Sequence, residues 1–393
     1  MAATLSDGPV IWLDGRNAKR AGGTGVARYT QAIAECLEQA GLPATYLTDQ
    51  VEGAPIGHPH SSARQVWRAV QTLRPAYPAT ICRDGGAPYA VCPDIFRIAH
   101  VRFKLWGALA TVSVPTPPDI MHWTYPLPIR MKGARNVVTI HDVVPLTHPE
   151  LTGIDPDRYR RLLRRLVRSA DAVVTISESA RRDIATQCDV PLSHIHNLFQ
   201  TAGFSADELR QAGQVLPPAP PGYFLHVGRV ESRKNICRLV AAHARSGTRR
   251  PLVLIGPDGD DRPDYAPFVG DTPVLRLPWC DQPSLIRAIQ DAHGLLFPSL
   301  AEGFGLPIVE AMALGTPVLT ARGGATEEIA ADAAILVDPL DIDDIARGIR
   351  TLDGLGETSA LRLALQGKGR LRASRFSRAA YTERLRQFYC SLL

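Results

Sequence analysis

Short apolar runs recur through the second half of the chain, and stretches with helical periodicity separate them. Each run is only three or four residues long and rich in Val, Ile, Leu or Phe, which predicts a buried strand. The runs cover residues 224–227, 252–255, 274–277, 295–297, 318–320 and 335–337. Because strands that alternate with helices form parallel sheets covered on both faces, residues 223–375 are predicted to fold as one doubly wound α/β domain.

The first half of the chain, residues 1–203, repeats this alternation less regularly. Its predicted strands cover residues 10–13, 44–48, 120–123, 137–140, 172–176 and 194–198, and its clearest helices cover 25–37 and 159–170. A linker over residues 204–222, with prolines concentrated in 214–222, separates the two halves. Residues 376–393 are predicted to form an amphipathic helix that crosses back onto the first domain. The expected fold is α/β, with two doubly wound, Rossmann-like domains facing a central cleft where ligands bind.

Composition narrows the class of protein. With 393 residues, 45% apolar and 21% charged, the chain has the size and composition of a two-domain globular enzyme. Its seven cysteines are scattered and form no Cys-x-x-Cys pair, which favours reduced thiols in the cytoplasm over a disulfide framework or a zinc site. The net charge of +5 indicates an anionic ligand or surface, and we expect no nucleic-acid partner. No apolar run approaches the roughly 20 residues that span a bilayer.

The segment 297–317 carries the strongest indication of a ligand site. A buried strand ends at Ser299, a glycine-rich loop follows, and a helix is predicted to begin near Pro307. Glu302 and Glu310 flank the start of this helix, and carboxylates accept hydrogen bonds from sugar hydroxyls. The backbone amides between them suit an anionic ligand, and they belong to Gly303, Phe304, Gly305 and Leu306. A nucleotide-sugar, which is anionic and rich in hydroxyls, fits this combination.

Residues 299–312, Ser-Leu-Ala-Glu-Gly-Phe-Gly-Leu-Pro-Ile-Val-Glu-Ala-Met, resemble the signature of the retaining glycosyltransferases of family 4, which share the GT-B fold. Further segments resemble the same family, namely 14–16 with 22–29, 138–145, 170–178 and 227–236. Together they span nearly the whole chain outside residues 50–116. The amino-terminal segments are similar to those of mannosyltransferases that assemble polysaccharides.

The resemblance implies roles for four charged residues. Arg229 and Lys234 would bind the diphosphate of the donor without a metal ion, together with the loop amides. Glu302 would hold hydroxyls of the transferred sugar, and Glu310 would hold the ribose. From the residues alone, Glu310 is also explained as a charge that complements the helix N-terminus.

Gly23 and Gly25 follow a predicted strand and precede a predicted helix, so their backbone is also expected to approach the diphosphate. The same pattern begins a dinucleotide-binding fingerprint, with Asp49 at the end of a second strand. Arg28 stands where the third glycine of that fingerprint belongs, which disfavours a nicotinamide cofactor. Asp258-Gly-Asp260 resembles a metal-binding motif, but we interpret it as a turn because cationic side chains already serve the phosphates. We therefore expect no metal ion and no cofactor beyond the donor itself.

His141 and Asp142 end a strand of the first domain and are expected to face the cleft as catalytic residues, opposite Glu302. Histidine transfers protons near neutral pH, and Asp142 would orient it or bind the acceptor. A merely hydrogen-bonded histidine is the alternative. Glu328 is expected to cap its own short helix. Residues 96–106 mix aromatic and basic side chains, which suits an anionic membrane or a lipid-linked acceptor, or else a helix that closes the core.

Together these observations predict a retaining, metal-independent glycosyltransferase that moves a hexose from a nucleoside-diphosphate sugar to a glycan or lipid-linked glycan. The resemblance favours GDP-mannose as the donor. The donors dTDP-rhamnose and UDP-sugars stay as alternatives, because Pro278 replaces a glycine that the family often has beside the nucleotide base. The alternatives are a nucleotide-sugar epimerase or hydrolase, and a catalytically silent nucleotide-sugar-binding protein. The enzyme is expected in the cytoplasm, in peripheral contact with an anionic membrane.

Overall fold

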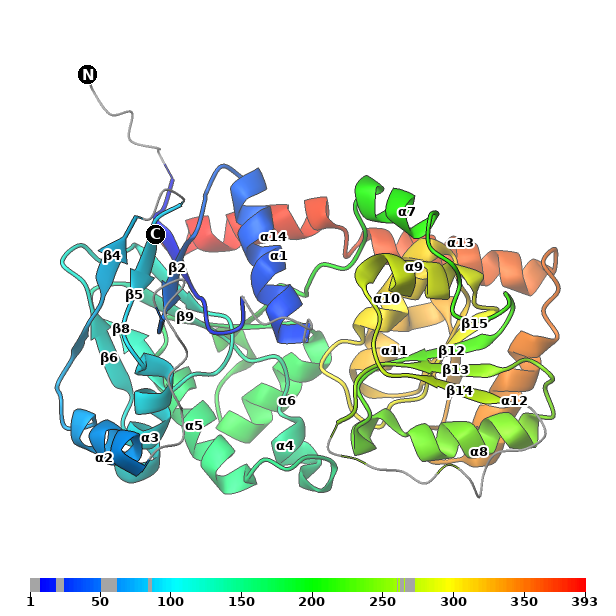
Figure 1. The fold of residues 1–393 in the computed structure, drawn as a ribbon, viewed down its shortest axis with the longest axis horizontal. Helices are drawn as coiled ribbons and strands as arrows, with labels where there is room; N and C mark the ends of the chain where they lie inside the picture. The colour runs from blue at the N-terminus through cyan, green and yellow to red at the C-terminus, as the bar shows by residue number, and fades with distance from the viewer. Residues whose placement is uncertain are drawn as a thin grey trace.

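The computed structural model describes residues 8–18, 25–50, 62–83, 87–259, 261, 265 and 273–393. Figure 1 shows two domains beside each other, with the helices α13 (Ala360–Ser374) and α14 (Arg378–Ser391) running along one side of both. In each domain, helices flank a central sheet of mostly parallel strands. This arrangement confirms the predicted pair of Rossmann-like domains.

The first domain contains an eight-stranded sheet in the order β11-β10-β9-β7-β1-β2-β5-β4, parallel except where β4 meets β5. A smaller sheet has the order β3-β6-β8. The strands are β1 (Ile11–Asp14), β2 (Thr45–Thr48), β3 (Tyr77–Pro78), β4 (Thr80–Cys82), β5 (Tyr89–Val91), β6 (Ala110–Ser113), β7 (Ile120–Trp123), β8 (Ile129–Met131), β9 (Arg135–Thr139), β10 (Ala172–Thr175) and β11 (Ile195–Asn197). All the strands predicted for this half are present. The sequence did not indicate β3 to β6 or β8, because these short runs interrupt their apolar residues with polar, small or proline residues.

The helices of the first domain bury the faces that their periodicity predicts. Tyr29, Ile33 and Leu37 of α1 are buried, and so is the stripe of α5 from Leu162 to Val167. The helices are α1 (Gly25–Gln39), α2 (Ser62–Gln71), α3 (Ile95–Trp106), α4 (Val144–Thr147), α5 (Pro156–Ser169) and α6 (Glu178–Cys188), with short 3-10 helices at Pro149–Leu151 and Leu192–His194. Helix α2 is an exception, because its apolar side chains Val66 and Val70 are exposed.

The second domain has a parallel sheet in the order β14-β13-β12-β15-β16-β17. The strand order reverses between β12 and β15, and ligands bind beside such a reversal at the carboxyl ends of the strands. The strands are β12 (Phe224–Val227), β13 (Leu252–Ile255), β14 (Val274–Leu277), β15 (Gly294–Phe297), β16 (Val318–Ala321) and β17 (Ile335–Val337). The helices around them are α8 (Ile236–Ser246), α9 (Gln282–Asp291), α10 (Leu306–Leu314), α11 (Gly324–Ala330) and α12 (Ile342–Asp353), with 3-10 helices at Ser232–Lys234 and Ala331–Ala333.

The connection between the domains contains a helix that its prolines did not indicate. Helix α7 (Ala206–Ala212) begins with a capping box, in which the side chains and amides of Ser205 and Glu208 bond each other reciprocally. It packs against α9 of the second domain. The linker is thus partly anchored, and its proline-rich stretch begins only after α7.

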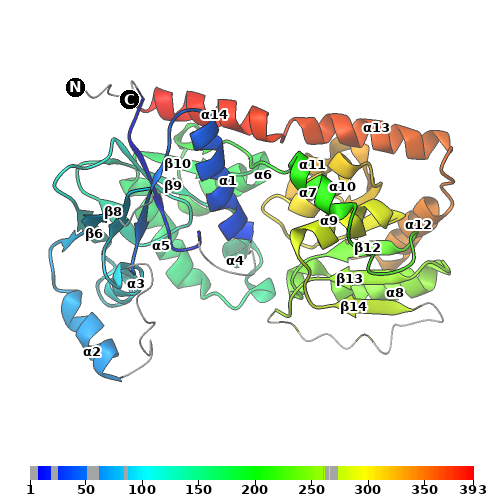
Figure 2. The same cartoon turned by 45° about the horizontal axis from the view of Figure 1, so that its top comes forward.

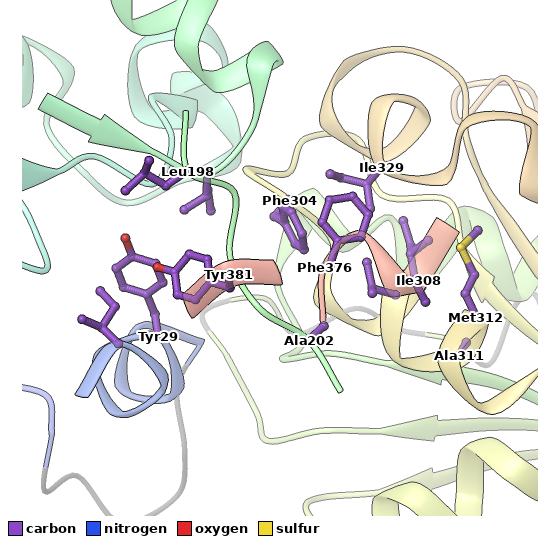
Figure 3. Packing of buried hydrophobic residues seen from close by; sticks show 14 of the residues in the cluster. Tyr29, Leu198, Ala202, Phe304, Ile308, Ala311, Met312, Ile329, Phe376 and Tyr381 are labelled. Atoms are coloured by element: carbon purple, nitrogen blue, oxygen red, sulfur yellow. The ribbon is translucent and has the colours of Figure 1, made fainter. Parts of the chain in front are cut away.

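Helix α14 crosses from the second domain back to the first, as Figure 2 shows. Its Tyr389 hydroxyl lies 2.5 Å from Nδ1 of His122, and both groups are buried. At the junction of α13 and α14, the buried ring of Phe376 contacts the rings of Phe199 and Phe304 at 5.5 and 5.3 Å between centroids. Figure 3 shows this apolar cluster, which is continuous from one domain to the other. The interface between the domains is therefore a packed core.

Two further sequence expectations concern thiols and membrane spans. All seven cysteines are reduced thiols, of which Cys36, Cys92 and Cys188 are buried and the others are partly or fully exposed. Among the described residues, no helix has both the length and the apolar character required to cross a bilayer.

Candidate functional site

The loops after β12 and β15 form one half of the site, and backbone contacts hold them together. The amide of Leu300 donates to the carbonyl of Arg233 at 2.8 Å. The side-chain amide of Asn235 donates to the carbonyl of Pro298 at 3.0 Å, and the left-handed backbone at Asn235 turns the chain into α8. This joining of loops places the side chains before Asn235 against the loop that carries Glu302.

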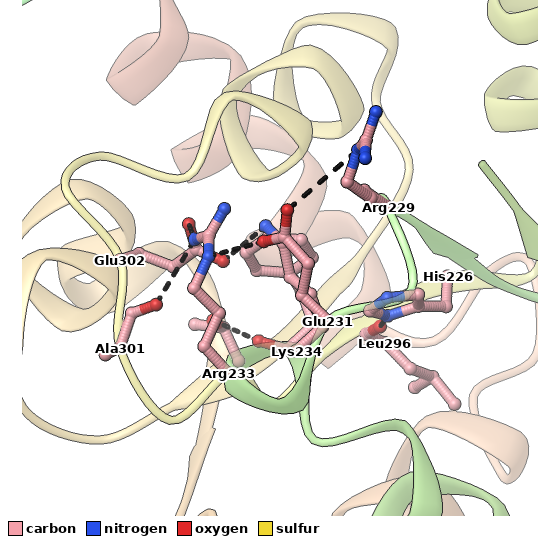
Figure 4. A network of polar contacts seen from close by, with 10 residues as sticks. His226, Arg229, Glu231, Arg233, Lys234, Leu296, Ala301 and Glu302 are labelled. Carbon is pink, nitrogen blue, oxygen red and sulfur yellow. Dashed lines mark hydrogen bonds and ion pairs between the residues drawn. The ribbon is translucent and has the colours of Figure 1, made fainter. Parts of the chain in front are cut away.

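Glu302 lies between two cations of the neighbouring loop, as Figure 4 shows. Its Oε1 accepts from Nζ of Lys234 at 2.5 Å, and its Oε2 accepts from Nη1 of Arg233 at 2.6 Å. The side chains of Glu302 and Lys234 are only 7% and 9% exposed. Nε of Arg233 also donates to Glu231 at 2.7 Å. The structure therefore brings the predicted residues Lys234 and Glu302 into direct contact.

Arg233 is a site residue that sequence reasoning missed. Its position next to Lys234 was the available signal, but adjacent residues usually point in different directions, so only the tertiary structure shows that both reach Glu302. The guanidinium bridges Glu231 and Glu302 as a forked donor, which a lysine cannot imitate.

The charges of this cluster shift the pKa of its members. Burial alone would raise the pKa of Glu302, but the charges of Arg233 and Lys234 outweigh it and lower the pKa to about 2. Burial lowers the pKa of Lys234, and the Glu302 carboxylate partly offsets this effect. At neutral pH the cluster therefore holds an ionised carboxylate between cations, in a position shielded from water.

Arg229 lies outside this cluster. Its side chain is 48% exposed, and its Nε is 4.0 Å from Glu231, which is too long for a hydrogen bond. Figure 4 shows it directed away from Glu302. The following residue, Val230, pairs with the turn after β13, because its amide donates to the carbonyl of Pro257 at 3.1 Å. Arg229 is thus a surface cation on a fixed turn beside the strand-order reversal.

The glycine loop after Glu302 touches the first domain. A Cβ atom at Gly303 would lie 2.7 Å from the carbonyl oxygen of His141, so only glycine permits this approach. Gly305 has φ of 97° and precedes the first turn of α10, and Phe304 is buried. The amides from Gly303 to Leu306 therefore start α10 directly beside the loop that follows β9.

His141 and Asp142 lie on the first-domain side of this contact. Nε2 of His141 donates to the carbonyl of Thr124 at 2.9 Å, since a carbonyl oxygen only accepts. Burial lowers the pKa of His141, so the ring is neutral at pH 7 and Nδ1 carries a lone pair. Oδ1 of Asp142 accepts from the amide of Val144 at 3.1 Å, which places it at the start of α4.

Glu310 forms an ion pair across the domain interface. Its Oε1 lies 2.9 Å from Nη1 of Arg28, which is in the first turn of α1, and the two side chains are 6% and 35% exposed. A cavity of about 650 Å³ adjoins this pair between α1, α10 and the start of α14. Its lining includes Arg28 and Glu310, but neither Lys234 nor Glu302, so it lies apart from the charged cluster.

Glu328 does not cap its own helix, which corrects the sequence expectation. Its two carboxylate oxygens accept from the amides of Glu178 and Ser179 at 2.8 and 2.7 Å, at the N-terminus of α6 in the other domain. A carboxylate stabilises such a helix end through hydrogen bonds and the helix dipole. Glu328 is therefore a contact between domains, which local sequence cannot reveal.

The remaining sequence predictions concern Gly23, Gly25 and the Asp258-Gly-Asp260 motif. Gly23 lies outside the described residues, and Gly25 is the first residue of α1, with open space where a Cβ would be. Asp258 forms an isolated parallel bridge with Val230 and lies 3.2 Å from Arg276, whereas Asp260 lies outside the described residues, so the turn stays a prediction. In the part of the chain that the structure describes, no group of three or more His, Cys, Asp or Glu side chains has the arrangement of a metal site.

Both domains match family models of glycosyltransferases. The model of Glycosyltransferase Family 4 matches residues 23–201, and the model of Glycosyl transferases group 1 matches residues 208–358. O-antigen chain mannosyltransferase B from Escherichia coli is 32% identical over an alignment of 309 residues, and the match covers 72% of this chain and 76% of that protein.

Other similar proteins are longer or more distant. The serotype-specific mannosyltransferase WbdA from Escherichia coli is 26% identical over an alignment of 278 residues, and the match covers 65% of this chain but only 32% of WbdA. Sucrose-phosphate synthase from Thermosynechococcus elongatus has a structure that aligns with a TM-score of 0.69 over 98% of this chain and 99% of its own, at 21% identity. This structural likeness establishes the fold alone.

Proposed function

The chain belongs to glycosyltransferase family 4, and from this premise we propose that it transfers mannose from GDP-mannose to a glycan or lipid-linked glycan, with retention of configuration. One observation carries the proposal most directly. An ionised, buried carboxylate, Glu302, is held between Lys234 and Arg233 at the point where the strand order reverses. A sugar diphosphate supplies both the hydroxyls and the negative charge that such a cluster recognises.

The leaving diphosphate is the first group that the site must stabilise. As the glycosidic bond breaks, negative charge develops on the departing phosphate oxygen. Lys234 supplies a point charge beside it, and the surface guanidinium of Arg229 supplies a forked donor. The amides from Gly303 to Leu306 add dipoles from the start of α10. These groups do the work that a divalent cation would otherwise do.

The transferred sugar lies between Glu302 and the first domain in this proposal. Sugar hydroxyls donate to the Glu302 carboxylate, which is ionised because its pKa is about 2. His141 offers the lone pair of Nδ1 to another hydroxyl, since its Nε2 proton is already bonded to Thr124. Glu310 receives the ribose hydroxyls once Arg28 releases it.

The configuration at C1 of the sugar is retained because the acceptor attacks the same face of the sugar from which the leaving group departs. The bond from the acceptor oxygen to C1 of mannose forms as the bond from C1 to the phosphate oxygen breaks. The acceptor proton passes to that departing oxygen, which leaves a glycoside and GDP. This route requires no carboxylate nucleophile on the opposite face.

The choice of mannose rests on the relatives, whereas GDP as the nucleotide follows from the family resemblance of the sequence. The proteins reported above from Escherichia coli are named as mannosyltransferases, and one is named for the O-antigen chain. A lipid-linked acceptor would place the enzyme at the cytoplasmic face of a membrane.

A donor screen tests this function. The full chain is incubated with GDP-mannose, UDP-glucose or dTDP-rhamnose, with and without a lipid-linked acceptor glycan, and nucleoside diphosphate and labelled glycan are measured. GDP and mannosylated glycan are expected only when the acceptor is present, and chelator is expected to leave the rate unchanged.

Variants separate the alternatives. Lys234→Ala is expected to lower transfer by about 100-fold, because it removes a charge beside the leaving group. Arg245→Ala is the matched control, since Arg245 is 62% exposed on α8 and pairs with Asp343. Altered or free sugar at full rate without acceptor would indicate an epimerase or hydrolase. Undiminished transfer by Lys234→Ala would contradict the site assignment.

A further inference from the structure

Helix α2 is oriented against the usual rule, with polar side chains inward and apolar side chains outward. Its Arg68 and the following Thr72 are 6% and 1% exposed. On the outer side, Val66, Val70 and Leu73 are 65%, 57% and 71% exposed. Trp67 lies between the outer valines and is 44% exposed. An amphipathic helix normally buries its apolar stripe, whereas nothing in the part of the chain that the structure describes buries this face.

Polar contacts fix this orientation. Nε of Arg68 donates to Asp94 at 2.5 Å, and the pair is largely buried. Nη1 of Arg102, on α3, donates to the backbone carbonyls of Thr72 and Arg74. Turning the helix over would break the ion pair and leave a buried charge alone, so the outward apolar stripe is held in place.

The end of α3 extends the same surface. Nε1 of Trp106 donates to Oγ1 of Thr72 at 3.0 Å, which places the indole beside the end of α2. Leu105 and Trp106 are 51% and 59% exposed, whereas Phe96 and Phe103 on the other side of α3 are buried in the core. Helix α3 thus closes the core and also presents apolar groups outward. We call this surface the α2–α3 face, comprising Val66, Trp67, Val70, Leu73, Leu105 and Trp106.

The segment around this face is strongly basic. Between residues 62 and 107 the acidic residues are Asp84 and Asp94, and Asp94 is paired with Arg68 and Arg97. The basic residues in the same segment are Arg64, Arg68, Arg74, Arg83, Arg97, Arg102 and Lys104. Arg74 and Lys104 are exposed, immediately beside Leu73 and Leu105 in the chain. Exposed tryptophans with neighbouring cations are the pattern of a helix that lies in an anionic bilayer interface.

We propose that the α2–α3 face docks the enzyme on the surface of an anionic lipid bilayer. A second copy of the chain is a poorer occupant, because a two-fold contact would bring the same cations together. Figures 1 and 2 show α2 on the side of the first domain opposite α14, so docking leaves the helix that joins the domains away from the membrane. The inference deepens the proposed function, on which it rests for the lipid-linked acceptor presented at such a surface.

Vesicle binding tests the docking separately from catalysis. The full chain is floated with vesicles of phosphatidylcholine alone or of phosphatidylcholine with phosphatidylglycerol. Wild type is expected to bind the anionic vesicles and to release them at high salt. Trp67→Ser is expected to weaken binding by about tenfold through lost apolar burial, and Lys104→Ala by about fivefold through lost charge.

A matched control guards against general effects of surface mutation. Leu371→Ser changes a side chain that is 74% exposed on α13, far from α2, and should bind vesicles as wild type does. Because Trp67 is exposed, Trp67→Ser should keep the thermal unfolding midpoint of wild type. Mannose transfer to a water-soluble acceptor should also be unchanged in Trp67→Ser, since this assay depends on the proposed function and not on docking.

Two outcomes would overturn the docking proposal, and a third would separate it from the proposed function. Equal binding of wild type and Trp67→Ser to anionic vesicles would show that another surface docks. Absence of vesicle binding, together with self-association that Trp67→Ser abolishes, would assign the α2–α3 face to contact between copies of the chain. Vesicle binding without any mannose transfer would leave docking supported and the proposed function contradicted.

Discussion

Replacing Arg233 with methionine tests how the site holds its central carboxylate. The guanidinium is 2.6 Å from Glu302 and 2.7 Å from Glu231, and its side chain is 25% exposed. At this distance the attraction to Glu302 is about 6 kcal/mol for an effective dielectric constant of about 20, before the cost of desolvation. Removing one partner of a buried pair typically costs about 3–5 kcal/mol. Because Glu302 keeps Lys234, we expect Arg233→Met to lower the free energy of unfolding by about 2–3 kcal/mol.

The same change is expected to affect catalysis through Glu302. Without Arg233, only the charge of Lys234 opposes the effect of burial, so the pKa of Glu302 rises. The carboxylate also loses one of its two fixed contacts. A displacement of about 1 Å in such a group lowers activity by about 100-fold. We therefore expect kcat/KM to fall by about 10- to 100-fold and the acidic limb of the pH–rate profile to move to higher pH.

Arg229→Met is the matched comparison, because Arg229 is a neighbouring arginine with a different environment. Its side chain is 48% exposed, and its Nε lies 4.0 Å from Glu231. We expect its unfolding free energy to stay within about 0.5 kcal/mol of wild type, whereas KM for the donor rises by about tenfold. Urea denaturation and steady-state kinetics measure both effects. Equal destabilisation by the two substitutions, or full stability and activity of Arg233→Met, would refute the assignment of Arg233 as the residue that positions Glu302.

Three further predictions concern the domain interface and pH. Arg28→Ala should bind GDP about fivefold more tightly, as measured by calorimetry, because the ribose no longer has to displace the Arg28 side chain from Glu310. Weaker binding would contradict the proposal that the ribose replaces Arg28. Glu328→Gln should lower the free energy of unfolding by about 1 kcal/mol, because it weakens the cap at the N-terminus of α6, and should increase the radius of gyration measured by X-ray scattering. Glu327→Gln, which changes a local contact to Gly323, should do neither. Because the folded-state pKa of Glu302 is lowered from 4.5 to about 2, its stabilisation is present above pH 4.5 and lost as pH falls toward 2. Denaturation curves should show about 3 kcal/mol of loss across that window, which Glu302→Gln should reduce.

The sequence determined most strands of the two main sheets and their type, but not β3 to β6, β8 or the linker helix α7. Runs such as Leu252–Ile255 form buried strands because a continuous apolar segment of this length is too short for a typical helix and suits a sheet covered on both faces. Glycine and proline at 305 and 307 placed the start of α10 correctly. Family resemblance then identified Lys234 and Glu302, which the structure brings together.

Only the tertiary structure decided which charges meet. Arg233 and Glu302 are 69 residues apart, and Arg28 and Glu310 are 282 apart, so no local pattern encodes their pairing. The reach of Glu328 to α6 across 150 residues likewise depends on how the two domains pack. The orientation of α2 is of the same kind, because its periodicity predicts an apolar face but the buried pair of Arg68 with Asp94 turns that face outward. Periodicity acts through neighbours along the chain, whereas ion pairs and exposure depend on what the rest of the fold places beside them.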